Sequence, residues 1–246
     1  MIWLATIAVV VGVLIGAVGV GGVLLIPALA WLTPLSMHAS MATALFTFVF
    51  TGLVASVLFQ RRGSIDWSLT LPLCAGGALF GFVGAWVNSR VDAQVLALIL
   101  ALLITLAGLY TLLGHSAGRP APLAGRPGAR RWLLFAVGAA TGFGSGLTGV
   151  GGPAISVPIM VLLGFPALAA VGAGQVVQVL AAISGSAGNL VHGQIDFHLA
   201  AILTLLEVLG VVLGVKLAHA VNAATLRRVV GVLCVAVGVG VALRFA

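Results

Sequence analysis

The sequence carries the same short glycine motif twice. Gly19–Gly22 reads GVGG, and Gly149–Gly152 repeats it 130 positions later. Glycine readily leaves the helical conformation, and a helix that begins after such a break presents unpaired N–H groups and the positive end of its dipole. We expect these helices to begin at Val23 and Pro153. Two such starts facing each other could hold an anion without a charged side chain; the alternative is that the glycines only allow close helix packing.

Neutral polar side chains follow each glycine motif in the next apolar run. Ser40 and Thr43 share one helical face in the first half, and Gln175 and Gln178 lie one turn apart in the second. Hydroxyl and amide groups can donate hydrogen bonds to an oxyanion. The hydroxyls have an alternative, which is to bond back to carbonyls of their own helix. Glutamine is costly in lipid, so we expect both glutamines to face the protein interior.

Glu207 is the only acid well inside an apolar run. An acid at the centre of a membrane helix costs roughly 2.5–3.5 kcal/mol on insertion scales and marks a functional site by default. Glu207 could carry a coupling proton, or it could be a neutral structural acid bonded to a neighbouring helix. Its counterpart in the first half is Gly77, so only one half has this acid.

The remaining acids and potential ligands have simpler interpretations. Asp66 and Asp196 each precede an apolar run, and we expect them to be helix N-caps. His192 and His198 have no third ligand at a metal spacing, so we expect no metal site. We find no matched nucleophile and base either, and expect neither enzymatic activity nor a cofactor.

The composition places these residues in a membrane. Of 246 residues 62% are hydrophobic and only 6% are charged, against roughly 25% charged in soluble domains. The apolar residues form runs long enough to cross a bilayer. This excludes a soluble enzyme, a nucleic-acid module and a disordered protein. The N-terminus lacks a basic region before its apolar run, so we interpret it as mature protein rather than a signal peptide.

The chain is an internal duplication. Besides GVGG, the sequence GSID at 63–66 matches GQID at 193–196 at the same offset. We divide the chain into repeat one (1–114), a basic linker (115–131) and repeat two (132–246). Each repeat is predicted to contain one Gly-broken segment and three transmembrane helices. The broken segments are 2–33 and 132–164, and the continuous spans are 38–60, 66–88, 92–114, 167–191, 196–218 and 224–245.

The broken segments either cross the membrane once or re-enter as hairpins. Their two arms measure about 25 and 16 Å at 1.5 Å per residue, so neither arm spans the core alone. Re-entry would put all of the eleven Lys and Arg on one side except Arg90 and Arg244. The positive-inside rule favours that arrangement. It predicts an all-α polytopic membrane protein of two inverted repeats, with a cytoplasmic linker and both termini outside.

The paired motifs resemble the TauE/SafE family of sulfite exporters and anion permeases. The resemblance rests on GxGG, a proline five or six residues later, a small-residue helix and the GxID turn, all repeated over nearly the whole chain. It implies a substrate site lined by the glycines, with His38, Ser40 and Thr43 resembling the family's stretch after the first proline. The family often has a third consecutive glycine, where this chain has Val23 and Pro153. The glycines concerned are Gly19, Gly21, Gly22, Gly149, Gly151 and Gly152.

Together these features predict a secondary transporter of a small sulfur-containing anion such as sulfite, thiosulfate or an organosulfonate. By resemblance it would be proton-coupled and lie in the bacterial inner membrane. An uncoupled anion channel or facilitator is the alternative that stays open. Its partners would be the anion and membrane lipid. The GxxxG pairs Gly77/Gly81 and Gly210/Gly214 would serve either internal packing or a homodimer.

Overall fold

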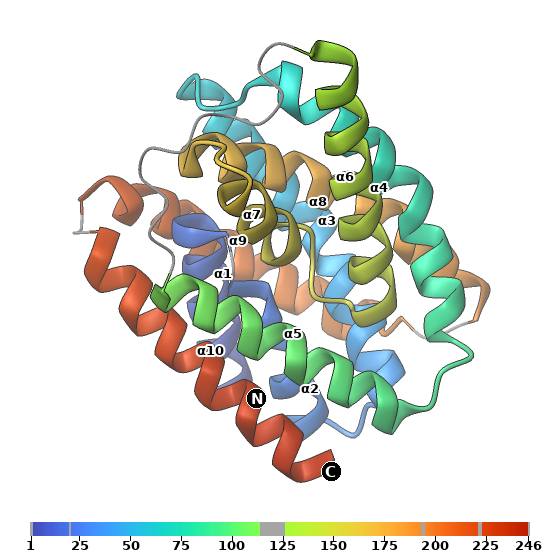
Figure 1. Cartoon of the computed structure of the whole chain (residues 1–246). Helices are drawn as coiled ribbons and strands as arrows, with labels where there is room; N and C mark the ends of the chain where they lie inside the picture. The colour runs from blue at the N-terminus through green and yellow to red at the C-terminus, as the bar shows by residue number, and fades with distance from the viewer. Residues whose placement is uncertain (1, 20, 114–125, 193–194, 221–222, 246) are drawn as a thin grey trace.

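The computed structural model describes residues 2–19, 21–113, 126–192, 195–220 and 223–245, all of whose regular elements are helices (Figure 1). The first half comprises α1 (Ile2–Val18), the 3₁₀ helix η1 (Gly21–Leu24), α2 (Leu25–Leu32), α3 (Met37–Arg61), α4 (Trp67–Asn88) and α5 (Ala93–Leu113). The second half comprises α6 (Pro127–Thr148), α7 (Pro153–Leu162), α8 (Ala167–Val191), α9 (Phe197–Ala220) and α10 (Ala223–Phe245).

The helices have the length and composition of a polytopic membrane protein. Within the described residues, five helices are long and apolar enough to cross a membrane: α3, α4, α5, α8 and α9. Large apolar side chains such as Leu71, Leu102 and Leu205 are exposed on their outer faces, as expected where the surrounding solvent is lipid. The predicted fold class, all-α and polytopic, is confirmed.

The first helix of the second half begins within the stretch predicted as linker (115–131), since α6 begins at Pro127. Proline is favoured in the first turn of a helix because its missing N–H has no partner there in any case. Arg130 and Arg131 therefore belong to the first turns of α6 rather than to a loop. The linker residues 114–125 lie outside the described part of the chain.

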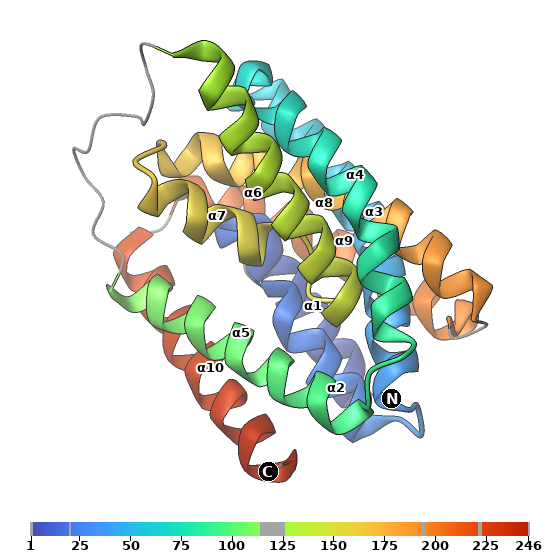
Figure 2. The same cartoon turned by 45° about the vertical axis from the view of Figure 1, so that its right-hand side comes forward.

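Each broken segment folds back on itself as a hairpin. In the second half α6 and α7 pack together, and the Arg130 guanidinium at the start of α6 lies 5.5 Å from the ring centroid of Phe165, just after α7. In the first half α2 packs against α1 and returns towards the end of the molecule where the chain begins (Figure 2). A fold-back of this kind is the geometry that a re-entrant segment requires, and re-entry into the membrane stays a prediction.

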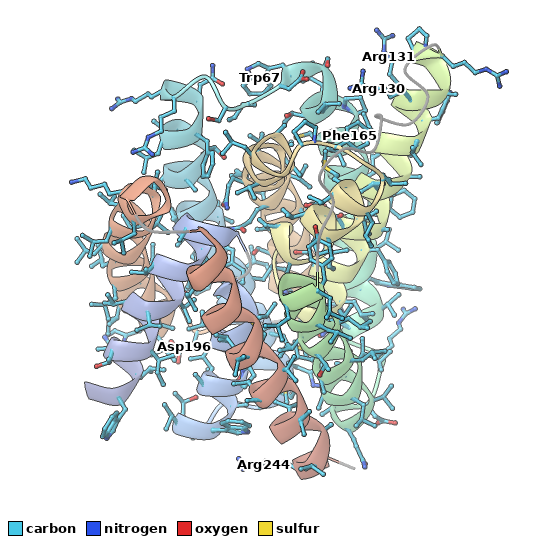
Figure 3. All side chains as sticks on the ribbon, turned by 60° about the vertical axis from the view of Figure 1, so that its left-hand side comes forward. Trp67, Arg130, Arg131, Phe165, Asp196 and Arg244 are labelled. Atoms are coloured by element: carbon cyan, nitrogen blue, oxygen red, sulfur yellow. The ribbon has the colours of Figure 1, made fainter. Side chains whose placement is uncertain are left out.

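The basic side chains gather at one end of the molecule. Figure 3 shows Arg130, Arg131, Trp67 and Phe165 at one end and Arg244 at the other. The end of α3 lies at the same end as Trp67, since Trp67 Nε1 donates to Gln60 Oε1 there. Arg62 Nη1 at this end of α3 donates to the Val215 carbonyl of α9, next to Lys216. Arg90 follows α4 at the opposite end.

Helices of the two halves pack with their backbones in contact at glycine residues. The helix α1 packs against α9, and its equivalent α6 packs against α4. A β carbon at Gly12 of α1 would collide with the backbone carbonyl of Glu207. A β carbon at Gly142 of α6 would collide with that of Gly77. Each pair lies 130 positions from the other, so the halves make equivalent contacts.

The GxxxG pairs serve this internal packing. Gly210 and Gly214 of α9 lie against the backbone of α1 at Val9 and Val13. Gly81 of α4 lies against the Ala181 carbonyl of α8. Small residues allow such close approach of helix backbones in membranes, where packing rather than hydrophobicity drives association. Of the two roles that the sequence left open, internal packing is therefore the one seen.

Replacing Gly142 by leucine should prevent α6 from docking on α4. The added side chain meets backbone atoms of Gly77, which cannot rotate away, and overpacking of this kind costs about 1–3 kcal/mol or more. We expect a lower thermal midpoint and less monodisperse protein by size-exclusion chromatography in detergent. Gly128→Leu is the control, because a β carbon there meets nothing within 4 Å. An unchanged midpoint for Gly142→Leu would contradict the interlocked packing.

Candidate binding site at the glycine breaks

The two glycine breaks meet in the interior of the protein. A β carbon at Gly19 would lie 3.3 Å from the Pro153 Cβ, and one at Gly22 would lie 3.2 Å from the Val150 carbonyl oxygen. Gly19, Gly149 and Gly151 have positive φ angles of 80°, 71° and 88°, a conformation that glycine adopts without steric cost. Segments 130 residues apart thus form one buried junction.

The second break leaves backbone donors without partners. Gly149 N–H donates to the Ser145 carbonyl, and the N–H groups of Ile155 and Ser156 both donate to the Gly152 carbonyl. Within the described residues, four N–H groups between Gly149 and Ile155 have no acceptor. These belong to Val150, Gly151, Gly152 and Ala154. Val150, Gly151 and Gly152 are themselves buried. Pro153 is the first residue of α7, as predicted. The start of α7 therefore offers buried donors and the positive end of a helix dipole.

The first break is built differently from the prediction. We expected a helix to begin at Val23, but Gly21–Leu24 forms a 3₁₀ turn and α2 begins only at Leu25. The first half has no proline at the position equivalent to Pro153, where Val23 stands. A tighter 3₁₀ turn is a common start to a helix where nothing fixes the first α-helical residue. Val23 is fully buried at the junction, within this turn.

Gln175 and Gln178 of α8 form hydrogen bonds to the helices on either side of the junction, α1 and α3. Gln175 Nε2 donates to the Ile15 carbonyl in α1 at 3.3 Å, and Gln178 Nε2 donates to the Phe48 carbonyl in α3 at 3.1 Å. A β carbon at Gly151 would lie 3.5 Å from Gln178 Oε1. Both glutamines are buried, in agreement with their cost in lipid. The Gln175 Oε1 atom has no hydrogen-bond partner among the described residues.

The polar face of α3 runs alongside the junction. Ser40, Thr43, Thr47 and Thr51 are all fully buried. Thr51 accepts a bond from Gln178 Nε2 at 3.3 Å, and Thr43 accepts the N–H of Asp196 at 3.1 Å. Thr47 donates to a carbonyl of its own helix, at Ala44, which is the alternative that the sequence left open for these hydroxyls.

Glu207 lies beside this polar face. It is fully buried on α9, and its carboxyl faces Thr47 of α3. Neither carboxyl oxygen makes a hydrogen bond within the described part of the chain. The close packing of Gly12 on the Glu207 backbone fixes the position of this turn.

His38 and Ser40 stand further along α3. The His38 ring nitrogen Nε2 is 3.0 Å from the Val91 carbonyl in the α4–α5 connection, and His38 is only half-buried. Ser40 Oγ is buried and has no partner among the described residues. The predicted site residues thus form two groups. The glycines, Gln175 and Gln178 lie at the breaks, and His38, Ser40 and Thr43 lie along the first turns of α3.

Phe48 is a junction residue that sequence reasoning missed. Its ring lies against both breaks: a β carbon at Gly22 would lie 2.8 Å from Phe48 Cζ, and one at Gly151 would lie 3.1 Å from Cδ2. A phenylalanine in an apolar run carries no signal of its own. The repeat does provide one, because Phe48 occupies the position equivalent to Gln178.

The sequence is similar to known membrane transporters along nearly its whole length. The family model described as sulfite exporter TauE/SafE matches residues 4–241. The chain belongs to this family. It is also 26% identical, over 244 residues and 88% of each chain, to a protein of Bacillus subtilis (strain 168) named probable membrane transporter protein YunE. No solved structure matches it.

Family membership makes the chain a multi-pass membrane transporter rather than an enzyme. In secondary transporters, binding sites commonly lie where broken helices meet near the middle of the membrane. The buried junction is therefore the first place to look for a binding site in this chain. The TauE/SafE match covers both breaks and all of α3, α8 and α9.

Replacing Gln175 by leucine should separate binding from stability. The change removes an unpartnered buried oxygen, while the Ile15 carbonyl keeps its bond from Gly19 N–H. We expect the thermal midpoint to stay the same or rise. We expect sulfite to raise the midpoint of the wild type but not of this variant, because a ligand stabilises only the protein that binds it.

The matched control is Gln60→Leu, which removes an exposed glutamine at the end of α3 whose partner is Trp67. Sulfite should still raise the midpoint of that variant in a thermal-shift assay. If sulfite raised the midpoint of Gln175→Leu as much as that of the wild type, Gln175 would not belong to the site.

Proposed function

We propose that the protein is a secondary transporter of a small sulfur-containing oxyanion, such as sulfite, thiosulfate or an organosulfonate, held where the two glycine breaks meet. The observation that carries the proposal is the buried cluster of unpartnered N–H groups at the start of α7. In a low-dielectric interior such donors are costly unless a ligand accepts from them. An oxyanion supplies several acceptors at once.

The chemistry of the junction favours an anion that must also leave. The donors are backbone amides and the second N–H of the Gln175 side-chain amide, none of which carries a full charge. A helix start with free amides binds phosphate, sulfate or carboxylate groups through hydrogen bonds and the helix dipole. A site without lysine or arginine releases its anion more easily, which suits transport. The glycines allow the anion to approach the backbone itself.

Two inverted repeats would supply the alternating access that such transport needs. The support comes from contacts that recur at the 130-residue offset, as between α1 and α9 and between α6 and α4. It also comes from the directions of the hairpins, since α1 begins at one end of the molecule and α6 at the other (Figure 1). The gathering of basic residues near the linker would make that end cytoplasmic by the positive-inside rule, in a bacterial inner membrane.

We assign the coupling proton to Glu207. Its carboxyl is buried, lacks a hydrogen-bond partner among the described residues and faces Thr47 on the polar face that leads to Gln178. Protonation would cancel the cost of a buried charge while the site is occupied. Release of the proton would then accompany release of the anion on the same side of the membrane.

The proposal is tested by sulfite and thiosulfate flux into proteoliposomes with and without an imposed pH gradient. We expect wild-type flux to rise with the gradient. Flux that ignores the gradient would make the protein a facilitator. Absence of flux for both anions would discard the substrate class.

In the same assay, Glu207→Gln should lose gradient-driven flux but keep anion exchange, because glutamine retains the shape of the side chain without a titratable proton. Asp66→Asn is the control, since Asp66 only caps α4 through the Ser68 N–H and asparagine is an equally good cap. Gradient-driven uptake at the wild-type rate by Glu207→Gln would remove the coupling role.

A further inference from the structure

The side chain of Asn88 is bonded to the end of the helix that precedes the second break. Asn88 is the last residue of α4, and only 3% of it is exposed. Its Nδ2 atom lies 2.6 Å from the carbonyl oxygen of Leu147 in α6 and 3.4 Å from the sulfur of Met41 in α3. The two N–H donors of this amide are therefore both engaged in the interior, each on a different helix.

The Leu147 carbonyl is one that the break deprives of its backbone donor. In a continuous α-helix the carbonyl of residue 147 accepts the N–H of residue 151, four positions along the chain. Here α6 ends at Thr148, and Gly149 takes up a positive φ angle of 71°. The Gly151 N–H has no acceptor among the described residues, and the Asn88 amide supplies the donor to Leu147 in its place.

The Asn88 amide thereby keeps two groups apart that would otherwise satisfy each other. A buried carbonyl without a donor is costly, and lipid supplies none. Without the amide, the Leu147 carbonyl has the Gly151 N–H one helical turn further along its own chain, and glycine can adopt the conformation that brings it back. That bond would lengthen α6 and close part of the break.

The break in the first half lacks this amide. The positions equivalent to Asn88 and Leu147 in the repeat hold Ala218 and Ala17, and the alanine side chain has no donor. In that half Gly21–Leu24 forms a regular 3₁₀ turn, whereas residues 149–152 of the second half form no helical turn. The half that has the asparagine is thus the half with the open backbone donors.

We propose that Asn88 is a positioning residue for the anion site: by occupying the Leu147 carbonyl, it keeps the Gly151 N–H free for the substrate. The inference rests on the proposed function, because it takes the free N–H groups of the second break to be those that hold the oxyanion. Asn88 acts through the backbone, since its own N–H donors are already engaged.

The test compares Asn88→Leu with the wild type, since leucine has nearly the shape of asparagine but no donor. Amide hydrogen exchange of the peptide 149–156 is measured first without sulfite. Exchange should be slower in the variant, because the Gly151 N–H becomes hydrogen-bonded, whereas mere damage to the fold would make it faster. In titration calorimetry the variant should bind sulfite at least about tenfold more weakly, because a hydrogen bond to a charged ligand contributes that much.

The matched control is Thr70→Val, at the other end of α4. Thr70 is fully buried, and its hydroxyl also donates to a backbone carbonyl, that of Asp66, at 2.8 Å. This carbonyl accepts the backbone N–H groups of Leu69 and Thr70 as well, so the substitution leaves it with donors. Thr70→Val should show wild-type exchange in the peptide 149–156 and wild-type sulfite affinity.

A second variant keeps the test decisive if Asn88→Leu does not yield monodisperse protein. Asn88→Ala removes the amide without placing new atoms beside Met41, and it should slow exchange in the same peptide. Unchanged or faster exchange in a well-folded Asn88 variant would overturn the proposal. Slower exchange together with the sulfite affinity of the wild type would overturn it as well.

Failure of this inference and failure of the proposed function give different results, because exchange without sulfite needs no ligand. If the wild type binds neither sulfite nor thiosulfate, the substrate proposal fails, while slower exchange in the Asn88 variants still supports the role of Asn88 in holding the break open. If the wild type binds sulfite and exchange is no slower in the variants, the function stands and the positioning role is wrong.

Discussion

A backbone N–H group inside a membrane must find an acceptor, because lipid supplies none. This protein interrupts a helix twice at membrane depth and so creates such groups deliberately in each half. Some of these N–H groups find acceptors within the protein, as the Gly149 N–H does at the Ser145 carbonyl. We propose that the donors left at the start of α7 make the junction an anion site. The rest of the fold keeps this irregular backbone away from lipid, which is where such segments are tolerated.

Glycine performs a second task that the first one requires. For the two breaks to meet, the hairpin of each half must be inserted deeply against the other half. That insertion is possible because α1 and α9, and likewise α6 and α4, approach until their backbones touch at Gly12 and Gly142. The same residue type therefore shapes the site and locks the scaffold around it. The small side chains also leave Glu207 in a fixed turn, facing α3 rather than lipid.

Much of this could be predicted from the sequence, for physical reasons that are easy to state. Long apolar runs fix the membrane helices, and a proline after glycines fixes the start of α7 at Pro153. The first break could not be predicted as well, because Val23 gives no such signal and the chain forms a 3₁₀ turn there instead. Which helices pack across the repeats depends on backbone approach, which no single residue announces. Phe48 could not be distinguished from the many other apolar residues. Only its position, equivalent to that of Gln178 in the repeat, indicates that it belongs to the junction.

The central claim is that backbone amides at the breaks hold the anion, and amide hydrogen exchange tests it most directly. Purified protein would be exchanged with and without sulfite and analysed by mass spectrometry of peptides covering 19–24 and 149–156. The account predicts that sulfite slows exchange in the 149–156 peptide, since a bound oxyanion engages the N–H groups of Gly151, Gly152 and Ala154. Slower exchange elsewhere, with no change in this peptide while sulfite is bound, would contradict it.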